Sequence, residues 1–564
     1  MQGLPRSYVH GASATPLLGE TVGANLERTV ARWPDRDAVV VRHQDVRWSY
    51  AALNEAVDGL AAGLLGLGLE PGERVGIWAP NSVEWVTTQF ATAKAGLILV
   101  NINPAYRLSE LSYALDKVGC SALITADRFK ASDYIALLRG LLPELDSAEP
   151  GALESERFPS LRSVVRLGEA HTAGMLNYAE VAAGGGAAER KRLADLAGEL
   201  QFDDPINIQF TSGTTGTPKA STLTHHNILN NAYFAALQMR FCERDRLCIP
   251  VPMYHCFGMV LGSLLCVTHG AAMVYPAAGF DAHATLAAIA AERCTALHGV
   301  PTMFIAELEA PDFERFDLSS LRTGIIAGAP CPIELMHRLI EQMHLPEITI
   351  GYGMTETGPL SFQTAPDDPI DRRVETVGRV LPHTEVKIVD EAGRVVPCGE
   401  PGELLTRGYC VMPYYWDDPE RTAAAIDRTR WIASGDVATL DADGYCRIVG
   451  RLKDMVIRGG ENIFPREIEE FLFEHPKIAD VQVIGVPDPK YGEELCACIE
   501  LHEGETASAA EIRAFCEGKI AHFKIPRYIV FVEGFPMTVT GKVQKYLLRE
   551  EMSEKLGLTE AKTA

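Results

Sequence analysis

The chain has 564 residues, of which 47% are hydrophobic and 23% charged, and its formal net charge is −23. These proportions are typical of a globular protein with several folding units, and they exclude a disordered or fibrous chain. A strongly acidic chain without a basic arm does not attract nucleic acid through a general positive field. An anionic ligand must therefore be held by a few individually placed cations.

The thirteen cysteines are scattered, and no CxxC pair or His/Cys cluster has the spacing of a zinc site. We therefore expect reduced thiols. The first residues show neither a secretion signal nor a transit peptide pattern, and the most apolar stretch, 257–267, is too short to span a bilayer. These features predict a soluble cytoplasmic protein without a transmembrane segment.

Helix-like and strand-like segments alternate from residue 48 onward. Helices are expected at 51–65, 83–95 and 111–117, and strands at 74–79, 97–102 and 122–125. This alternation is typical of βαβ units in a parallel sheet covered on both faces. Further buried strands are expected at 206–210, 271–275, 323–327 and 348–352. The Glu-, Ala- and Gly-rich segment 142–200 is interpreted as a variable surface connection without chemistry.

The pattern changes near residue 386, where short strands with Gly and Asp turns predict a β-rich subdomain that ends near 451. The remainder predicts a compact α+β unit. Its expected helices are 465–473 and 509–520, and its expected strands are 481–486, 495–501 and 528–532. The fold class is thus predicted to be α/β, with layered α/β subdomains and a β-rich subdomain in a large N-terminal domain (1–451). A small C-terminal α+β domain (454–564) follows.

A loop rich in hydroxyls and glycines follows the strand 206–210. It reads Thr211-Ser212-Gly213-Thr214-Thr215-Gly216-Thr217-Pro218-Lys219. The glycines permit positive φ and close backbone approach, so that successive N–H groups can surround an anion. The hydroxyls donate to phosphate oxygens, and Lys219 adds a full charge. The expected ligand is a polyphosphate, but the spacing is not that of a Walker A loop, so a P-loop NTPase is not predicted.

This loop resembles the phosphate loop of the adenylate-forming (AMP-binding) enzyme superfamily, which includes acyl-CoA synthetases, adenylation domains of peptide synthetases and luciferases. Further stretches match in the family's order. They are Ala327-Gly328-Ala329-Pro330, Tyr352-Gly353-Met354-Thr355-Glu356-Thr357, Ser434-Gly435-Asp436, Gly450-Arg451-Leu452-Lys453-Asp454 with Arg458-Gly459-Gly460-Glu461-Asn462-Ile463, and Thr540-Gly541-Lys542. The resemblance covers residues 17–549, and the chain is most similar to fatty acid–CoA ligases of the medium-chain acyl-CoA synthetase family member 2 type.

The adenine side of the expected nucleotide site lies where an apolar strand ends, which is where ligands of open α/β sheets collect. The ring of Tyr352 can stack on adenine above the bare backbone of Gly353. The turn formed by Gly328, Ala329 and Pro330 lets backbone carbonyls approach the purine edge.

The phosphate side of the site is assigned to the residues that follow, Met354, Thr355 and Glu356. Thr355 is suited to hydrogen-bond the α-phosphate. Glu356 is a hard oxygen ligand for Mg²⁺, which prefers one or two carboxylates together with substrate phosphates. The alternative for Glu356 is a structural carboxylate at a helix N-terminus.

The ribose and the catalytic cation are assigned mainly by the resemblance. Asp436 can accept from both ribose hydroxyls, with Arg451 as its partner on the ribose or phosphate side, although Ser434 stands where the family usually has Thr. Lys542 is expected to neutralise the charge that develops when a carboxylate attacks the α-phosphate. Lys453, in the predicted hinge 452–453, is the residue about which a mobile C-terminal domain would swing.

The acyl wall is predicted in the segment 253–259, which contains His255, Cys256 and Phe257. No acidic residue occurs from Pro252 to Met273, so the ammonium of an amino acid substrate would be unpaired, and amino acids are disfavoured. His255 either orients the substrate carboxylate or is a structural histidine. A medium- to long-chain fatty acid is expected, with ATP, Mg²⁺ and coenzyme A as the other reactants.

The activity expected from the resemblance is thus that of an AMP-forming fatty acid–CoA ligase. The alternatives left open are an acyl-AMP ligase that loads a carrier protein, a ligase for aryl or other carboxylic acids, a luciferase-like oxygenase and a non-catalytic binding protein. Peripheral membrane contact is left open because the expected substrate is lipid-like. The oligomeric state is also open, with a homodimer as one option.

Overall fold

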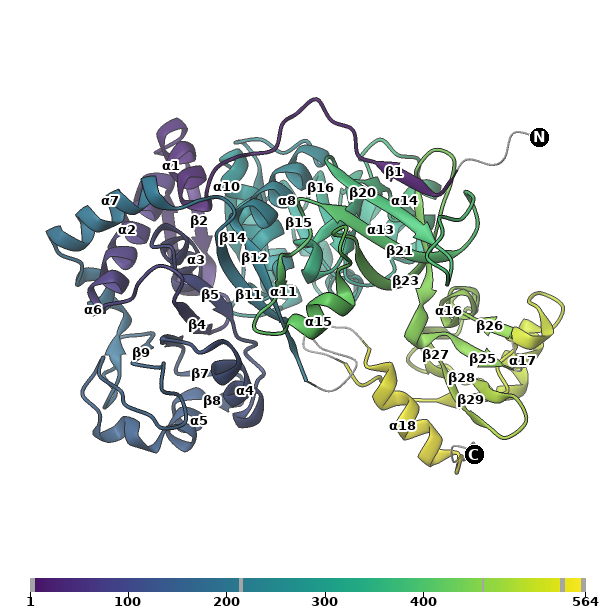
Figure 1. Cartoon of the computed structure of the whole chain (residues 1–564). Helices are drawn as coiled ribbons and strands as arrows, with labels where there is room; N and C mark the ends of the chain where they lie inside the picture. Colours follow the sequence, from purple (N-terminus) through teal and green to yellow (C-terminus); the bar gives the residue numbers. More distant parts are fainter. Residues whose placement is uncertain (1–5, 212–216, 459–460, 538–542, 559–564) are drawn as a thin grey trace. The chain divides into compact units, whose positions relative to one another are not determined.

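The structure is a computed structural model that describes residues 6–211, 217–458, 461–537 and 543–558. The chain divides into two compact units. Figure 1 labels their helices and strands. The larger unit contains residues 10–385 and 406–432, and the smaller contains 1–9, 386–405 and 433–564. The domain boundary expected at residues 451–454 stays a prediction.

The larger unit is built on two sheets. The first has eight strands in the order β10-β9-β6-β4-β5-β11-β12-β22, parallel from β10 to β11 and antiparallel from there on. Its strands are β10 (Leu176–Asn177), β9 (Ser163–Arg166), β6 (Ala122–Thr125), β4 (Arg74–Trp78), β5 (Ile98–Asn101), β11 (Pro205–Thr211), β12 (Lys219–Thr224) and β22 (Tyr414–Tyr415). The hairpin of β11 and β12 brackets the hydroxyl- and glycine-rich loop.

The second sheet has nine strands in the order β19-β18-β17-β16-β15-β13-β14-β2-β3. They are β19 (Arg379–Val380), β18 (Leu360–Gln363), β17 (Glu347–Gly353), β16 (Thr323–Ala327), β15 (Ala296–Gly299), β13 (Arg246–Cys248), β14 (Ala272–Tyr275), β2 (Asp37–Val41) and β3 (Val46–Ser49). The central strands from β17 to β2 are parallel, so β16 and β17 end at the same edge. The sheet thereby brings the segments 328–330 and 352–356 to one edge.

Helices connect these strands, as expected for βαβ units. They are α1 (Val22–Arg32), α2 (Tyr50–Gly66), α3 (Val83–Lys94), α4 (Leu108–Val118), α5 (Tyr134–Leu141), α6 (Tyr178–Ala183), α7 (Ala187–Glu199), α8 (His225–Gln238), α9 (Cys256–Gly258), a π-helix (Met259–Leu264), α10 (Leu265–His269), α11 (Ala282–Glu292), α12 (Pro301–Leu308), α13 (Ile333–Gln342), α14 (Ile370–Glu375) and α15 (Pro419–Ala425). Most begin with a side-chain cap, such as Ser49 before α2 and Ser82 before α3.

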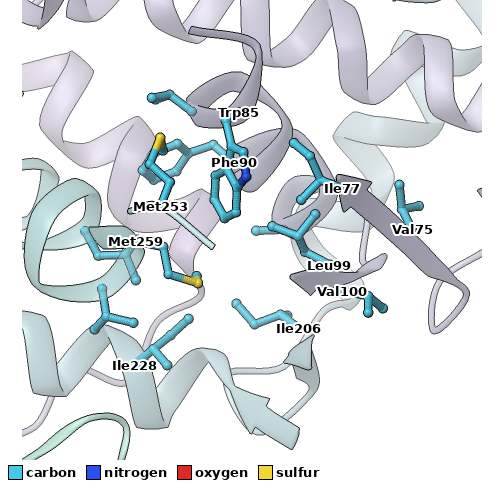
Figure 2. Packing of buried hydrophobic residues seen from close by; sticks show 14 of the residues in the cluster. Val75, Ile77, Trp85, Phe90, Leu99, Val100, Ile206, Ile228, Met253 and Met259 are labelled. Atoms are coloured by element: carbon cyan, nitrogen blue, oxygen red, sulfur yellow. The ribbon is translucent and has the colours of Figure 1, made fainter. Parts of the chain in front are cut away.

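The core of the larger unit forms where α3 packs on the first sheet. Nearly every residue of α3 is buried, as expected for a helix covered on several sides. Figure 2 shows part of this core, in which Trp85 and Phe90 of α3 meet Ile77 of β4 and Leu99 of β5. Burial of such aromatic side chains is a large share of the hydrophobic stabilisation of a core.

The smaller unit contains most of a five-stranded sheet and, after it, an α+β region. The sheet has the order β1-β20-β21-β23-β24. Its strands are β1 (Tyr8–His10), β20 (Thr384–Val389), β21 (Gly402–Gly408), β23 (Ile432–Leu440) and β24 (Cys446–Arg451). The later region contains β25 (Val456–Arg458), β26 (Glu461–Ile463), α16 (Pro465–Leu472), β27 (Ile478–Asp488), β28 (Gly492–Leu501), α17 (Ala509–Cys516), β29 (Tyr528–Phe531) and α18 (Lys545–Lys555).

The predicted α/β class and the predicted helices and strands are confirmed to within a few residues at most ends. The interpretation of 142–200 as a plain surface connection is wrong. This segment contains β9, which pairs in parallel with β6 inside the first sheet, and α7, which contacts α2. Gly185 of this segment also packs closely against α2, because a Cβ on Gly185 would lie 2.3 Å from the Cβ of Ala62. The Glu- and Ala-rich composition of the segment does not indicate β9, a four-residue strand whose first three residues are buried.

Candidate active site

The mouth of the β11–β12 hairpin is fixed by strand pairing. Thr211 and Lys219 are partners in the antiparallel register, so the two ends of the predicted phosphate loop lie opposite each other. Ser212, Gly213, Thr214, Thr215 and Gly216 lie outside the described residues, and their assigned role stays a proposal.

The C-terminal side of this loop is held by side chains from two other elements. Tyr113 of α4 donates from its hydroxyl to the carbonyl of Pro218 at 2.9 Å. Arg421 of α15 donates from Nη2 to Oγ1 of Thr217 at 3.2 Å. The Arg421 guanidinium therefore lies beside the loop, although sequence analysis did not select it.

Glu356 lies in a short 3-10 turn, Thr355–Thr357, that follows the end of β17. Its Oε1 accepts from the hydroxyl of Tyr415 at 2.9 Å and from that of Thr211 at 3.3 Å. Among the described residues, both hydrogen bonds to the carboxylate of Glu356 end on Oε1, and Oε2 accepts none. Mg²⁺ is commonly bound by one or two protein carboxylates together with substrate phosphates. The Glu356 carboxylate suits this role, because two donors orient Oε1 while Oε2 is available to a metal ion.

Tyr415 of β22 is a site residue that sequence analysis missed. Besides its bond to Glu356, its ring centroid lies 5.1 Å from Nζ of Lys219, which is within the range of a cation–π contact. Burial, and after it the Glu356 charge, raises the pKa of Tyr415 well above its ordinary range, so the hydroxyl keeps its proton and donates. Its only signal in the sequence was a run of three aromatic residues before Asp-Asp-Pro, which does not distinguish a site residue from a core residue.

The predicted acyl wall contacts the predicted phosphate residues. Cys256 is buried, and its Sγ lies 3.7 Å from Oγ1 of Thr355 and 3.5 Å from Nδ1 of His255. Nδ1 of His255 also accepts from the N–H of Phe257 at 3.1 Å and so caps α9. In its neutral form the imidazole therefore carries its proton on Nε2. Both roles considered for His255 are compatible with this arrangement, since the cap fixes the ring while Nε2 is a donor.

The adenine-side residues occupy the shared edge of β16 and β17. Gly328 has φ +91°, a left-handed conformation that favours glycine, and it begins an exposed turn with Ala329 and Pro330. The ring of Tyr352 is half-buried and packs edge-on against Phe362 with 6.1 Å between centroids. A Cβ on Gly353 would lie 2.0 Å from the carbonyl oxygen of Pro359, so the position requires glycine.

The predicted ribose and hinge residues lie in the smaller unit. Asp436 of β23 and Arg451 of β24 are strand partners, and their side chains form an ion pair, Arg451 Nε to Asp436 Oδ1 at 2.9 Å. Asp436 is buried, and Arg451 is half exposed. Lys453 is exposed in the 3-10 turn Leu452–Asp454. Lys542 lies outside the described residues.

No helix among the described residues combines the length and the hydropathy that a bilayer span requires.

Comparisons with known proteins agree with these motifs. The AMP-binding enzyme family matches residues 26–416, and the AMP-binding enzyme C-terminal domain matches residues 467–542. The medium-chain acyl-CoA ligase ACSF2, mitochondrial, of Danio rerio is 49% identical over 558 residues, which are 98% of this chain and 92% of that protein.

Two solved structures share the fold. The anthranilate CoA ligase AuaEII in complex with anthranoyl-AMP is 28% identical with a TM-score of 0.84, and the match covers 96% of this chain and 99% of that one. ATP-bound MatB from Rhodopseudomonas palustris is 27% identical with a TM-score of 0.79, over 95% and 100% of the two chains. The match to the family extends over most of the chain, so the resemblance drawn from the motifs is confirmed and the chain belongs to the AMP-binding enzyme family.

Proposed function

We propose that this protein is an ATP-dependent, AMP-forming fatty acid–CoA ligase. The carboxylate of a fatty acid attacks the α-phosphorus of ATP, which forms acyl-AMP and releases pyrophosphate. The thiol of coenzyme A then attacks the acyl carbon, which forms the thioester and releases AMP. The observation that carries this proposal is the convergence of Lys219, Thr211 and Glu356 at the mouth of the β11–β12 hairpin.

The residues divide the work between binding ATP and stabilising charge. The loop Thr211–Lys219 and Thr355 would hold the phosphates, and Glu356 would hold Mg²⁺, which neutralises phosphate charge when bound. Tyr352 and the turn 328–330 would hold adenine, and Asp436 with Arg451 would hold ribose. In this scheme no protein nucleophile is required, because positioning and charge neutralisation lower the barrier.

A medium-chain fatty acid is the proposed acyl substrate. The wall around Cys256 and Phe257 contains no acidic side chain, and both residues are buried. The zebrafish relative is named a medium-chain acyl-CoA ligase. We also keep a cytoplasmic location within the proposal. Because that relative's name includes mitochondrial, cell fractionation is the relevant test of location.

The two half-reactions are tested separately with Lys542→Ala. We expect this variant to lose acyl-AMP formation by about a hundredfold or more, the size of effect seen when one preorganised donor is removed. Thioester formation from supplied acyl-AMP and coenzyme A should persist, since that step does not use the same charge. Lys555→Ala, at an exposed position of α18, is the matched control and should retain both steps.

Acyl specificity is tested by measuring pyrophosphate release with straight-chain acids of graded length and with aryl acids. A maximum at medium length supports the proposal. A preference for aryl acids, or transfer to a carrier protein but not to coenzyme A, would favour the alternative ligases. If Lys542→Ala retained both half-reactions, the assignment of Lys542 would be wrong.

A further inference from the structure

Tyr415 joins the two charged side chains of the phosphate site. Its hydroxyl donates to Oε1 of Glu356 at 2.9 Å, and its ring lies 5.1 Å from Nζ of Lys219. These charged groups come from different sheets, since Glu356 follows β17 of the nine-stranded sheet and Lys219 begins β12 of the eight-stranded one. Tyr415 is therefore in contact with both the acidic and the basic component of the site.

The backbone of Tyr415 is fixed on two sides. On one side β22 pairs with β12, with Tyr415 opposite Ser221, and the N–H of Trp416 donates to the carbonyl of Ala220 at 2.8 Å. On the other side the N–H of Tyr415 donates to Oγ1 of Thr422 in α15 at 3.0 Å. The side chain is 3% exposed, so it has little freedom to change rotamer.

The same short segment also supplies Arg421, which bonds to Thr217 at the end of the phosphate loop. Asp418 caps α15 by accepting from the N–H of Arg421 at 3.1 Å, so the start of this helix is defined. Residues 414–425 thus contact the loop, its lysine and the carboxylate of Glu356 at once. A segment with only a packing role would not be expected to contact all three.

We propose that Tyr415 is a positioning residue of the phosphate site, which orients the Glu356 carboxylate through its hydroxyl and seats the Lys219 ammonium on its ring. This inference rests on the proposed function. Without the hydroxyl, Glu356 loses its shorter hydrogen bond and can rotate away from the phosphates. Without the ring, Lys219 also loses the surface that holds its ammonium near the loop.

Two substitutions separate these effects. Tyr415→Phe removes only the hydroxyl, and Tyr415→Leu removes the hydroxyl and the aromatic ring. The matched control is Tyr414→Phe, which removes a hydroxyl from the neighbouring, more exposed residue of the same strand. For each protein, the dissociation constant of ATP is measured by calorimetry with and without Mg²⁺. The KM for ATP, the KM for the fatty acid and kcat are measured alongside the thermal midpoint.

For Tyr415→Phe we expect ATP affinity with Mg²⁺ to fall about tenfold, the size expected for loss of a hydrogen bond to a charged group. ATP affinity without Mg²⁺ and the KM for the fatty acid should change less than about threefold. Tyr415→Leu should weaken ATP binding in both conditions, because Lys219 is also displaced. Tyr414→Phe should match the wild type.

The inference is overturned if Tyr415→Phe lowers the thermal midpoint but binds ATP with Mg²⁺ as tightly as the wild type, since Tyr415 would then only pack. It is also overturned if Tyr414→Phe has the same effect on ATP binding. Failure of the proposed function looks different, because the wild type itself would then bind no ATP.

Discussion

Glu307 is a carboxylic acid enclosed in an apolar part of the larger unit. It lies in α12, is 1% exposed, and neither of its carboxyl oxygens has a hydrogen-bond partner among the described residues. Burial raises its pKa well above the ordinary value of 4.5. An ionised carboxylate without a partner is costly inside a protein, so burial favours the protonated form of Glu307 in the folded state.

The raised pKa of Glu307 determines how stability depends on pH. Below about pH 4.5 the acid is neutral in both the folded and the unfolded state, so its ionisation costs nothing there. As the pH rises above that value, the unfolded state loses the proton and the folded state keeps it. The free energy of unfolding therefore decreases with pH, by up to about 1.4 kcal/mol per unit, until the folded pKa is passed.

We predict that Glu307→Met stabilises the protein, and more so at high pH. Methionine has a similar length and no polar atom to bury. The thermal midpoint of the variant should exceed that of the wild type by a larger margin at about pH 8 than at about pH 5. Glu309→Met changes an exposed glutamate next to the same helix and should show no such pH-dependent gain. An equal margin at both values would contradict the ionisation argument.

Residue identity alone does not reveal Glu307 or Tyr415. A glutamate in an Ala- and Leu-containing helix is normally placed on the solvent side, and a tyrosine in a run of aromatic residues is normally placed in the core. Glu356 could be selected because it stands within an ordered set of family motifs. The positions of Glu307 and Tyr415 depend on which elements pack against theirs, and that information is not local in the sequence.

At the scale of elements, the π-helix Met259–Leu264 is hydrogen-bonded to a buried histidine of another strand. Nε2 of His298, in β15, donates to the carbonyl of Leu261 at 3.0 Å, and its Nδ1 accepts from the N–H of Ile325 in β16 at 3.1 Å. The imidazole ring also lies 5.4 Å from the ring of Phe257. His298 thus links the predicted acyl wall to the strand that ends at the adenine turn.

We predict that His298→Phe destabilises the protein by about 2–4 kcal/mol near neutral pH, because two backbone groups lose their partner in the interior. Burial lowers the pKa of His298 from 6.5 to about 4. Between these pH values His298 is protonated in the unfolded state and neutral in the folded state. The free energy of unfolding of the wild type therefore falls as the pH falls from 6.5 to about 4. The variant should show a shallower fall over this window, measured by urea unfolding at several pH values.

The control for His298 is His283→Phe, since His283 is an exposed histidine paired with Asp312. It should have little effect on stability near neutral pH. If His298→Phe followed the same pH profile as the wild type, protonation of His298 would not be a source of acid sensitivity.

Elements with a clear period of apolar residues could be predicted, such as α2 and β4. The missed elements lack that signal or depend on distant pairing. α18 buries only Leu548 and Met552, which is too short a stripe to identify an amphipathic helix. β1 is the edge strand of a sheet whose other strands lie more than 370 residues later in the chain. The contact between the π-helix and His298 could not be inferred either, because His298 lies in a strand that is distant in the sequence.

At the scale of the whole molecule, the proposed site residues belong to two compact units. The larger unit supplies Lys219, Tyr352 and Glu356, and the smaller unit supplies Asp436 and Lys453. A reaction in two steps needs different groups beside the same ligand in turn. In the proposed scheme, the part of the smaller unit that follows residue 453 rotates to exchange these groups, and the exposed 3-10 turn Leu452–Asp454, which lies within that unit, fits the requirement for a hinge.

We predict that Lys453→Pro separates the two half-reactions. Proline fixes φ near −65° and limits the backbone rotation that a hinge needs. Acyl-AMP formation in a single turnover should change less than about threefold, because the proposed rotation is needed only after acyl-AMP has formed. Thioester formation from supplied acyl-AMP should then fall at least about tenfold. The measurement is rapid quenching of each step with separately supplied reactants.

Lys453→Ala distinguishes rotation from the lysine's charge, because alanine removes the ammonium and leaves φ unrestricted. Both half-reactions of this variant should stay near wild-type rates, since Lys453 is assigned no contact with the reactants. If the alanine variant lost thioester formation as strongly as the proline variant, the side chain would be the functional part. If neither variant changed either step, rotation about residue 453 would not limit turnover, and the hinge would have to lie elsewhere.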